Sequence, residues 1–292
     1  MTACSGVARQ PPPARSAAHL GRTRAAGAIF ELAAPDAFDI VHSDPGPGGY
    51  LAYAYSFASV LDGRIDEATA VFETLLDLEI VRVGGPLRAL PTFWLGRATL
   101  AQGRVSTATR LCRDALDILG DENHFETGTW VAATLATAAA HAGDIEAATT
   151  AVAWIDAHTR VHVESDALFT NLARAWLSAS RGELSTARDI ALDVAQYAGK
   201  AGAWTIEMTA LLDVARLGAP RLATPRLAEL AQIVEGPYAA AAAGFARAAA
   251  AGDGAGLDEA GARFAAMGAR LLAAEATAAA ADPALLGHTL PG

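Results

Sequence analysis

Apolar residues recur along this chain with the period of a helix. Each set of them follows a glycine, and the whole pattern is repeated along the chain. Each copy of the pattern has an aliphatic residue two positions after the glycine, an alanine five after it, and further residues of the same face nine and twelve after it. In the first copy these are Ile65, Ala68, Phe72 and Leu75 behind Gly63. Offsets of five, nine and twelve share one face of a helix. The pattern therefore predicts a helix after each glycine, and the glycine suits the C′ position of the preceding helix, where φ is positive.

The pattern is clear in four copies and weaker in two. Its glycines are Gly63, Gly103, Gly143, Gly182, Gly218 and Gly252, spaced 34 to 40 residues apart. Seven positions before each of the first four glycines stands a small residue: Ser56, Gly96, Ala136 and Ala175. A small side chain at this offset lets a neighbouring helix approach closely.

The spacing predicts a helical hairpin, repeated six times, in which a first helix (A) and a second helix (B) are joined by the glycine turn. The A helices are predicted over 48–62, 87–102, 126–142, 165–181, 203–217 and 237–251, and the B helices over 65–80, 105–119, 145–158, 184–199, 221–234 and 257–280. Pro86, Pro220 and Pro237 fall near helix starts, where a missing N–H is tolerated. Pro225 falls inside the fifth B helix, so that helix is expected to start later or to bend.

One hairpin cannot bury its own apolar face, so the six hairpins are expected to stack into an all-α superhelix over residues 46–282. Alanine accounts for 73 of the 292 residues, which suits tight helix contacts. Five tryptophans, Trp94, Trp130, Trp154, Trp176 and Trp204, are expected to fill the remaining gaps. Residues 1–45, which include three consecutive prolines, are expected to form a disordered or poorly ordered leader, and 283–292 a tail.

Composition excludes several classes of protein. Alanine favours helix and is depleted in strands, which argues against a β-sandwich or barrel. Charged residues make up only 18% of the chain and hydrophobic residues 52%, which argues against disorder throughout. Lys200 is the only lysine. Schiff-base chemistry and a phosphate-gripping lysine are therefore restricted to that one position.

Charge and cysteine content narrow the expected partners and location. The net charge is −10, and the acids and arginines of residues 1–44 cancel, so the body of the chain is expected to repel nucleic acid. No apolar stretch is long enough to span a bilayer, so no membrane partner is expected. Cys4 and Cys112 cannot form a disulfide framework, and Cys112 is expected in the core. These features predict a cytoplasmic protein.

The spacing of a glycine, an alanine five positions later and a bulky residue nine positions later resembles that of the tetratricopeptide repeat. The resemblance is clearest over residues 50–200. The period of 39 or 40 residues in this region is longer than the usual 34 of that family. The C-terminal third resembles the repeat array of LuxR-type transcriptional regulators of the large ATP-binding class. That resemblance is carried by 215–218 (ARLG), 226–231 (RLAELA), 234–237 (VEGP), 249–254 (AAAGDG) and 264–276 (FAAMGARLLAAEA), and it extends over 46–282.

The resemblance implies a tetratricopeptide-like α-superhelix of about six hairpins that acts as a sensor or interaction module. Two departures from the family matter. The ATPase module of such regulators needs a glycine-rich loop ending in Lys-Ser/Thr, and Lys200 lies in Gly199-Lys200-Ala201, which lacks that pattern. The family's helix-turn-helix would follow residue 282. We therefore expect the array alone, without an ATPase loop or a DNA reader.

Candidate metal and catalytic residues have simpler explanations. His158 and His162 stand four apart, as zinc ligands on a helix can, but they straddle a predicted helix end, so a solvated loop is the preferred interpretation. Four residues of an acidic cluster, Asp121, Glu122, Asn123 and Glu126, suit helix capping better than a calcium loop, which requires glycine at its sixth position. His141 is expected at a helix C-terminus, favourably placed on the helix dipole. No catalytic, cofactor-binding or metal site is predicted.

Aromatic residues are the remaining candidates for ligand contact. Core packing is the default interpretation for each of them. The first A helix has no certain neighbour on its outer side, which makes Tyr50 and Tyr53 candidate partner-binding residues. Trp94 and Trp130 are added because A helices are expected to line the concave face of a superhelix.

Three functions remain open at this point. The preferred one is a non-catalytic interaction or sensor module, which resembles part of a LuxR-type regulator and binds a protein, a peptide or a small effector on its concave face. The alternative is a free-standing tetratricopeptide-like adaptor. The remote alternative is an α/α-type enzyme with an acidic central site, which is disfavoured because carboxylates do not recur at matched inward positions.

Overall fold

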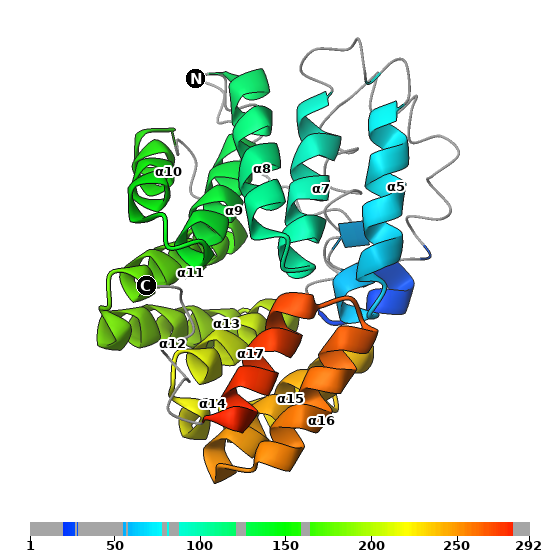
Figure 1. Ribbon diagram of the computed structural model, residues 1–292, viewed down its shortest axis with the longest axis vertical. Coiled ribbons are helices and arrows are strands. Elements are labelled where there is room, and N and C mark those ends of the chain that lie inside the picture. Colours follow the sequence, from blue (N-terminus) through cyan, green and yellow to red (C-terminus); the bar gives the residue numbers. More distant parts are fainter. Residues whose placement is uncertain are drawn as a thin grey trace, which may run out of the picture.

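The described part of the protein is all helical. A computed structural model describes residues 20–26, 28, 55–56, 58–77, 81, 88–120, 127–158 and 164–282, and none of these lies in a strand. The helices are α5 (Ile65–Asp77), α7 (Ala89–Ala101), α8 (Val105–Leu119), α9 (Thr127–His141), α10 (Ile145–His158), α11 (Glu164–Ser180), α12 (Leu184–Lys200), α13 (Trp204–Arg216), α14 (Pro220–Leu230), α15 (Pro237–Ala251), α16 (Gly254–Ala266) and α17 (Arg270–Ala281). Neighbours in sequence pack side by side, so the chain forms a curved array (Figure 1).

The observed helices follow the predicted bounds closely from α7 to α15, but the predicted helix over 257–280 is wrong. It is two helices, α16 and α17, separated at Gly268, whose φ is +78°. The uniformly alanine-rich sequence hid this break, because alanine continues a helix on both sides of the glycine. The fifth B helix, α14, begins at Pro220 as its first residue and contains Pro225, so it does not start later than predicted.

The recurring glycine ends its helix in one defined way. All six glycines of the pattern have positive φ, from 66° to 85°. At Gly63 the amide donates to the carbonyl of Val60 (3.1 Å), and the next amide, of Arg64, donates to Ser59 (2.7 Å). This is the Schellman arrangement, which satisfies the last carbonyls of the helix. The predicted C′ role of these glycines is therefore confirmed, and it requires glycine because the left-handed conformation penalises a Cβ atom.

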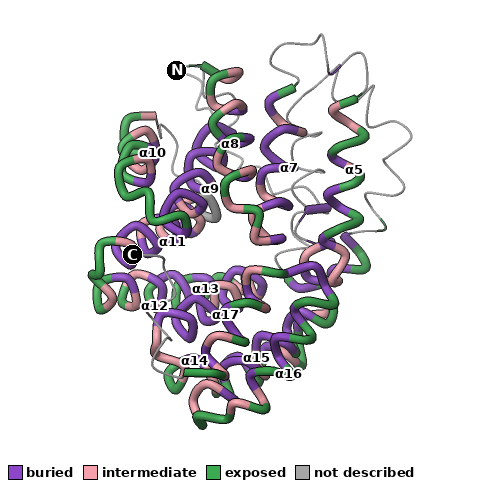
Figure 2. The backbone as a smooth tube through the Cα atoms, viewed as in Figure 1, coloured by how far each residue is buried: buried purple, intermediate pink, exposed green. Residues whose placement is uncertain are grey.

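The array has an inner and an outer layer of helices. This explains why some helices are apolar on all faces and others on one face only. Nearly every residue of α9 and α13 is buried. In α10, by contrast, only Ala148, Ala151 and Ile155 are buried. Figure 2 shows the same contrast between the inner helices α7, α9, α11, α13 and α15 and the outer helices that follow them. A helix that is buried on all sides is mostly apolar on all sides, and its polar side chains need partners.

Small residues set the distance between the two layers. Gly96 in α7 faces Cys112 in α8, and a Cβ atom at position 96 would lie 3.0 Å from the Cys112 sulfur. The equivalent small residues Ser56, Ala136 and Ala175 are each at most 1% exposed. The predicted role of this position in close helix approach is confirmed.

The two ends of the array meet. Helix α17 contacts α7, and Arg270 at its start donates to both carboxylate oxygens of Asp66 in α5, at 3.0 and 2.9 Å. The Gln102 amide donates to the same carboxylate at 2.7 Å. Gly103 approaches α17 so closely that a Cβ atom there would lie 3.0 Å from the backbone nitrogen of Leu271. The curved array is therefore closed on itself.

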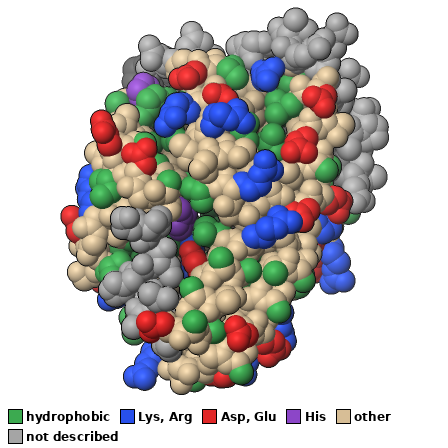
Figure 3. Space-filling model, viewed as in Figure 1, with side chains coloured by type: hydrophobic (Ala, Val, Ile, Leu, Met, Phe, Trp, Pro, Cys, Tyr) green, Lys and Arg blue, Asp and Glu red, His purple; other side chains and the backbone are tan. Residues whose placement is uncertain are grey.

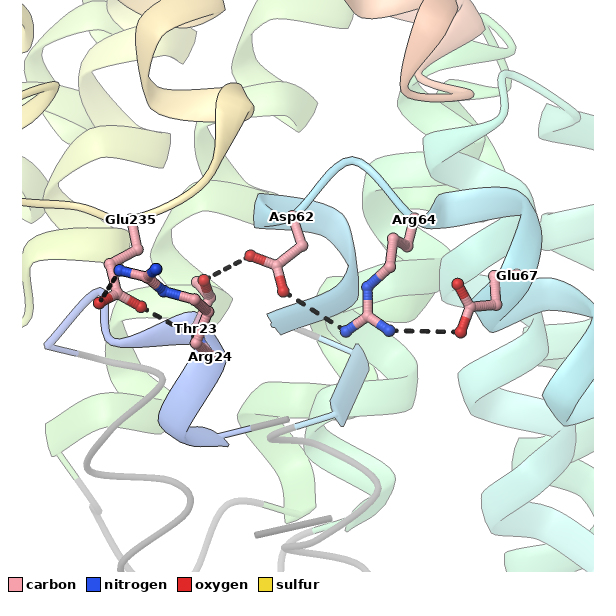
Figure 4. Close-up of polar contacts among 6 residues, drawn as sticks. All are labelled: Thr23, Arg24, Asp62, Arg64, Glu67 and Glu235. Atoms are coloured by element: carbon pink, nitrogen blue, oxygen red, sulfur yellow. Dashed lines mark hydrogen bonds and ion pairs between the residues drawn. The ribbon is translucent and has the colours of Figure 1, made fainter. Parts of the chain in front are cut away.

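Residues 20–28 belong to this closure. The amide of Glu235, in the turn after α14, donates to the Gly21 carbonyl (2.8 Å), and its carboxylate pairs with Arg24 (3.2 Å). Thr23 is fully buried, and its hydroxyl donates to the carboxylate of Asp62 in the turn before α5 (Figure 4). The backbone and side chains of this stretch therefore pair with two distant turns. The rest of 1–45 and the predicted tail 283–292 lie outside the described residues.

Two glycines provide a test of the closure. Gly103 and Gly182 have similar φ values, 73° and 79°, but a Cβ atom at Gly182 meets nothing within 4 Å. We expect Gly182→Ala to lower the free energy of unfolding by about 1 kcal/mol, which is the cost of the left-handed conformation alone. Gly103→Ala should cost at least twice as much, because its Cβ atom also displaces the backbone of Leu271. Urea unfolding of both variants measures the difference, and equal losses would show that the contact with α17 adds nothing.

Candidate functional site

A cavity lies inside the closed array. Its volume is about 230 Å³, and its wall comes from every inner helix, from residues 60–61 and 65, and from α17. The surface is hollowed where the upper and lower groups of helices meet (Figure 3). Because α17 contributes Leu271 and Leu272 to the wall, the cavity exists only in the closed arrangement.

The wall is mainly apolar, with four aromatic rings from three helices. Trp130 of α9, Phe169 and Trp176 of α11, and Tyr238 of α15 all line the cavity. Leucine side chains from α7, α11, α13 and α17 complete the apolar part. A concave, mostly apolar pocket with a few polar groups is the usual form of a small-molecule site.

A buried ionic cluster contributes Asp213 and Arg216 to one side of the cavity. The Arg216 guanidinium donates to both carboxylate oxygens of Glu275 and to Asp213, each at 2.7 Å. Asp213 also accepts from the Trp176 indole N–H at 3.1 Å, and Arg216 lies over the Trp176 ring at 4.3 Å. These three charged side chains are at most 9% exposed, so they connect α13 to α17 inside the protein.

Burial and charge shift the pKa values of this cluster in opposite directions. Burial raises the pKa of Asp213, and the charge of Arg216 opposes that effect. Burial acts against the charge of Arg216, but the two carboxylates outweigh it and raise the arginine pKa further above its ordinary value. The guanidinium is therefore charged at every pH at which the protein folds.

His141 is a neutral side chain in the cavity wall. It is the last residue of α9, is 8% exposed, and its ring lies 4.3 Å from the Trp176 ring. Burial lowers its pKa well below 6.5, and the charge of Arg216 lowers it further. The expected position of His141 at a helix C-terminus is confirmed, and desolvation outweighs the effect of the helix dipole on its pKa.

Tyr238 is the second buried polar group of the wall. It is 9% exposed, and its ring packs edge-on against Phe264 at 5.7 Å. Burial raises the pKa of its hydroxyl above the ordinary value, so this group is a neutral donor. Within the part of the chain that the structure describes, neither the Tyr238 hydroxyl nor the His141 ring makes a hydrogen bond. Buried polar groups normally have partners, so both groups are suited to bind a ligand or water in the cavity.

The predicted partner-binding residues fall in different environments. Trp130 is 5% exposed and lines the cavity, so it remains a candidate. Trp94 has no exposed surface and packs between Phe93 and Trp130. A partner cannot reach Trp94 directly in this arrangement, because neighbouring rings cover it. Tyr50 and Tyr53 lie outside the described residues.

The other candidates do not converge on a site. His158 ends α10 and stacks on Trp154 at 4.0 Å, with its Nδ1 atom 2.8 Å from the Trp154 carbonyl oxygen. His162 and the acidic cluster over 121–126 lie outside the described residues. Among residues that are described, no three His, Cys, Asp or Glu side chains are placed to hold a metal. Cys112 is fully buried as expected, and burial raises the pKa of its thiol to about 12.

Sequence reasoning missed most of the cavity. Arg216 and Glu275 are 59 positions apart and look like ordinary surface residues of two helices. A usable signal was present for Asp213 and Arg216, because both stand in a helix whose other positions are almost all apolar. Charged residues in a helix buried on all sides must pair with something. No comparable signal marked Tyr238.

Comparison with protein-family models, with curated proteins and with solved structures finds no match for this chain. Within the described residues, no helix has the length and apolar character needed to cross a membrane.

Replacement of Arg216 tests how much the ionic cluster contributes to the free energy of unfolding. We expect Arg216→Met to lower the free energy of unfolding by about 3–5 kcal/mol, because it leaves two buried carboxylates without their cation. The control is Arg263→Met, which breaks an exposed pair with Glu259 and should cost less than about 1 kcal/mol. Removal of all three charges, by adding Asp213→Leu and Glu275→Leu, should recover most of the loss. Similar losses from the two single variants would contradict the assigned role.

The pKa of His141 predicts a dependence of stability on pH. Because the folded-state pKa is depressed, the unfolded chain binds more protons below pH 6.5, so the free energy of unfolding falls as the pH drops from 6.5. This one group contributes a slope of at most about 1.4 kcal/mol per pH unit. Urea unfolding between pH 7.5 and 5.5 should show a shallower slope for His141→Asn than for the unsubstituted protein. The other titratable groups are the same in both proteins, so their contribution to the slope cancels in the comparison. Identical slopes would therefore contradict the lowered pKa of His141.

Proposed function

We propose that this protein is a non-catalytic helical-repeat sensor module that binds a small effector in its central cavity. The observation that carries the proposal is the cavity itself, which is lined by all the inner helices and has in its wall two buried polar groups without a hydrogen bond to any described residue. Its volume of about 230 Å³ lies between the ~150 Å³ cavity that accepts benzene and the ~300 Å³ lower end of small-molecule sites.

The fold that we propose for this role is a tetratricopeptide-like superhelix of about six hairpins. Support comes from the recurring glycine turns, from the small residues between layers and from the inner position of each first helix. The proposed descent from the array of LuxR-type regulators rests on the sequence motifs of the C-terminal third. These motifs fall in α13 to α17, the region that closes the cavity.

A small effector fits the cavity better than a protein or peptide partner. The concave side, where an extended peptide would bind, is occupied by α17, and an occupant of the space that is left must be small. The described apolar side chains with large exposure, such as Leu222 at 61% and Ile233 at 47%, are scattered and few. Single exposed apolar residues are normal on a protein surface and do not indicate a docking face.

An enzymatic role is disfavoured by the chemistry of the wall. Asp213 and Glu275 are both bound by Arg216, so neither carboxylate is available as a base. His141 has Trp176 and Arg216 as its neighbours. The threonine hydroxyls that line the cavity, at 134, 137 and 209, donate to backbone carbonyls and not to His141. Catalysis by a nucleophile requires such a side chain within hydrogen-bond reach of its base.

Two threonine variants test the proposal. Thr137 in the cavity wall and Thr74 on exposed α5 each donate to the carbonyl four residues earlier, at 3.0 and 2.9 Å. Thr137→Met should fill part of the cavity and abolish binding, while Thr74→Met should leave it unchanged. Binding is measured as the shift in Tm produced by a library of metabolites and confirmed by calorimetry. If no compound raises the Tm, or if Thr137→Met retains every hit, the cavity is not an effector site.

A further inference from the structure

The chemistry of the cavity wall restricts the class of ligand that it can bind, if the proposed function holds. The charged side chains described in the cavity lining are Arg97, Asp213 and Arg216. Glu275 does not line the cavity, but it binds Arg216 from behind, so the formal charges of these two cations and two anions cancel. The guanidinium of Arg97 lies over the Phe169 ring at 5.4 Å. An additional ion would leave water for a mostly apolar space without a matching opposite charge, which costs several kcal/mol.

The polar groups that remain for a ligand are neutral. The Tyr238 hydroxyl can donate, and the His141 ring has one nitrogen that donates and one that accepts. The threonine hydroxyls of the wall at 134, 137 and 209 already donate to backbone carbonyls, so they offer only acceptor lone pairs. The wall therefore matches a ligand that carries both a hydrogen-bond acceptor and a donor.

The apolar part of the wall favours an aromatic body for that ligand. Rings of Trp130, Phe169, Trp176 and Tyr238 border a space somewhat larger than benzene requires. Aromatic rings pack well against one another in offset or edge-on arrangements, and they lose little conformational entropy when bound.

We infer that the cavity binds an uncharged aromatic compound with one polar end, and that Tyr238 and His141 hydrogen-bond to that end. A primary aromatic carboxamide has this chemistry, because its carbonyl accepts from Tyr238 while its amide group donates to the His141 ring or to a threonine oxygen. The inference rests on the proposed function and names the class of effector.

Three probes of nearly the same shape test the inference on the full chain. Benzamide is neutral, benzoate carries one negative charge and benzamidine carries one positive charge at pH 7.5. Calorimetry and ligand-observed NMR should show benzamide binding at least tenfold more tightly than either ion. Tyr238→Phe should weaken benzamide about fivefold, the value of one hydrogen bond of about 1 kcal/mol. The matched control is Tyr197→Phe on α12, where the ring is 44% exposed, and it should leave the affinity unchanged.

The possible outcomes separate the inference from the proposed function. If benzoate or benzamidine binds more tightly, and Thr137→Met abolishes that binding, the cavity is an effector site but the assigned ligand class is wrong. If benzamide binds equally to the unsubstituted protein, to Tyr238→Phe and to Thr137→Met, it binds elsewhere and the inference fails. If none of the probes binds while a library compound does, only the ligand class fails. If no compound of any class binds, both the inference and the proposed function fail.

Circular dichroism checks that each variant folds. If Tyr238→Phe does not fold, Thr137→Met still reports on the cavity.

Discussion

Closure of the helical array on itself is the constraint on which the cavity depends. An open curved array has a groove along its inner face, whereas here α17 crosses that face and contacts α7. Three kinds of contact hold it there: the buried pairing of Arg216 with Glu275, the exposed pairing of Arg270 with Asp66, and backbone approach at Gly103. They differ in what they contribute. The exposed pair is screened by solvent and adds little free energy, and the close approach at Gly103 allows dense packing.

The buried cluster contributes specificity of position more than net stability. Burial of three charged side chains is costly, and an apolar set of similar volume often stabilises a protein as well or better. A bidentate pair, however, has a narrow geometry that an apolar contact lacks. A shift of α17 by one turn along α13 would leave Glu275 and Arg216 buried without partners. Such a shift is penalised by several kcal/mol, which fixes the wall that α17 provides to the cavity.

The sequence was sufficient to predict local structure and insufficient for the closure. Helix bounds, turn glycines and small contact positions such as Gly96 depend on residues close in sequence, and their spacing was visible. The partners Asp66 and Arg270 are 204 positions apart, and nothing in either helix identifies the other. The break at Gly268 was missed because its flanks are alanine. The helix-terminal position of His141 was predicted, but its lowered pKa was not, because that pKa depends on burial and on Arg216, which only the folded arrangement brings close. The candidate site consists of such long-range juxtapositions, so only Trp130 among its residues was anticipated.

The wall of the proposed ligand site includes residues from both sides of the closure. Leu271 and Leu272 belong to α17, while Trp130, Phe169 and Tyr238 belong to inner helices, so a ligand in the cavity touches both sides of the contact that closes the array. A compound that binds the closed form but not an open one stabilises the closed form by RT ln(1 + [L]/Kd), which is about 2.7 kcal/mol at a concentration of 100 Kd. This is comparable to the loss expected from one glycine substitution at the closure. For such a compound the position of α17 and the occupancy of the cavity would be thermodynamically coupled, with no contact needed beyond those that already form the wall.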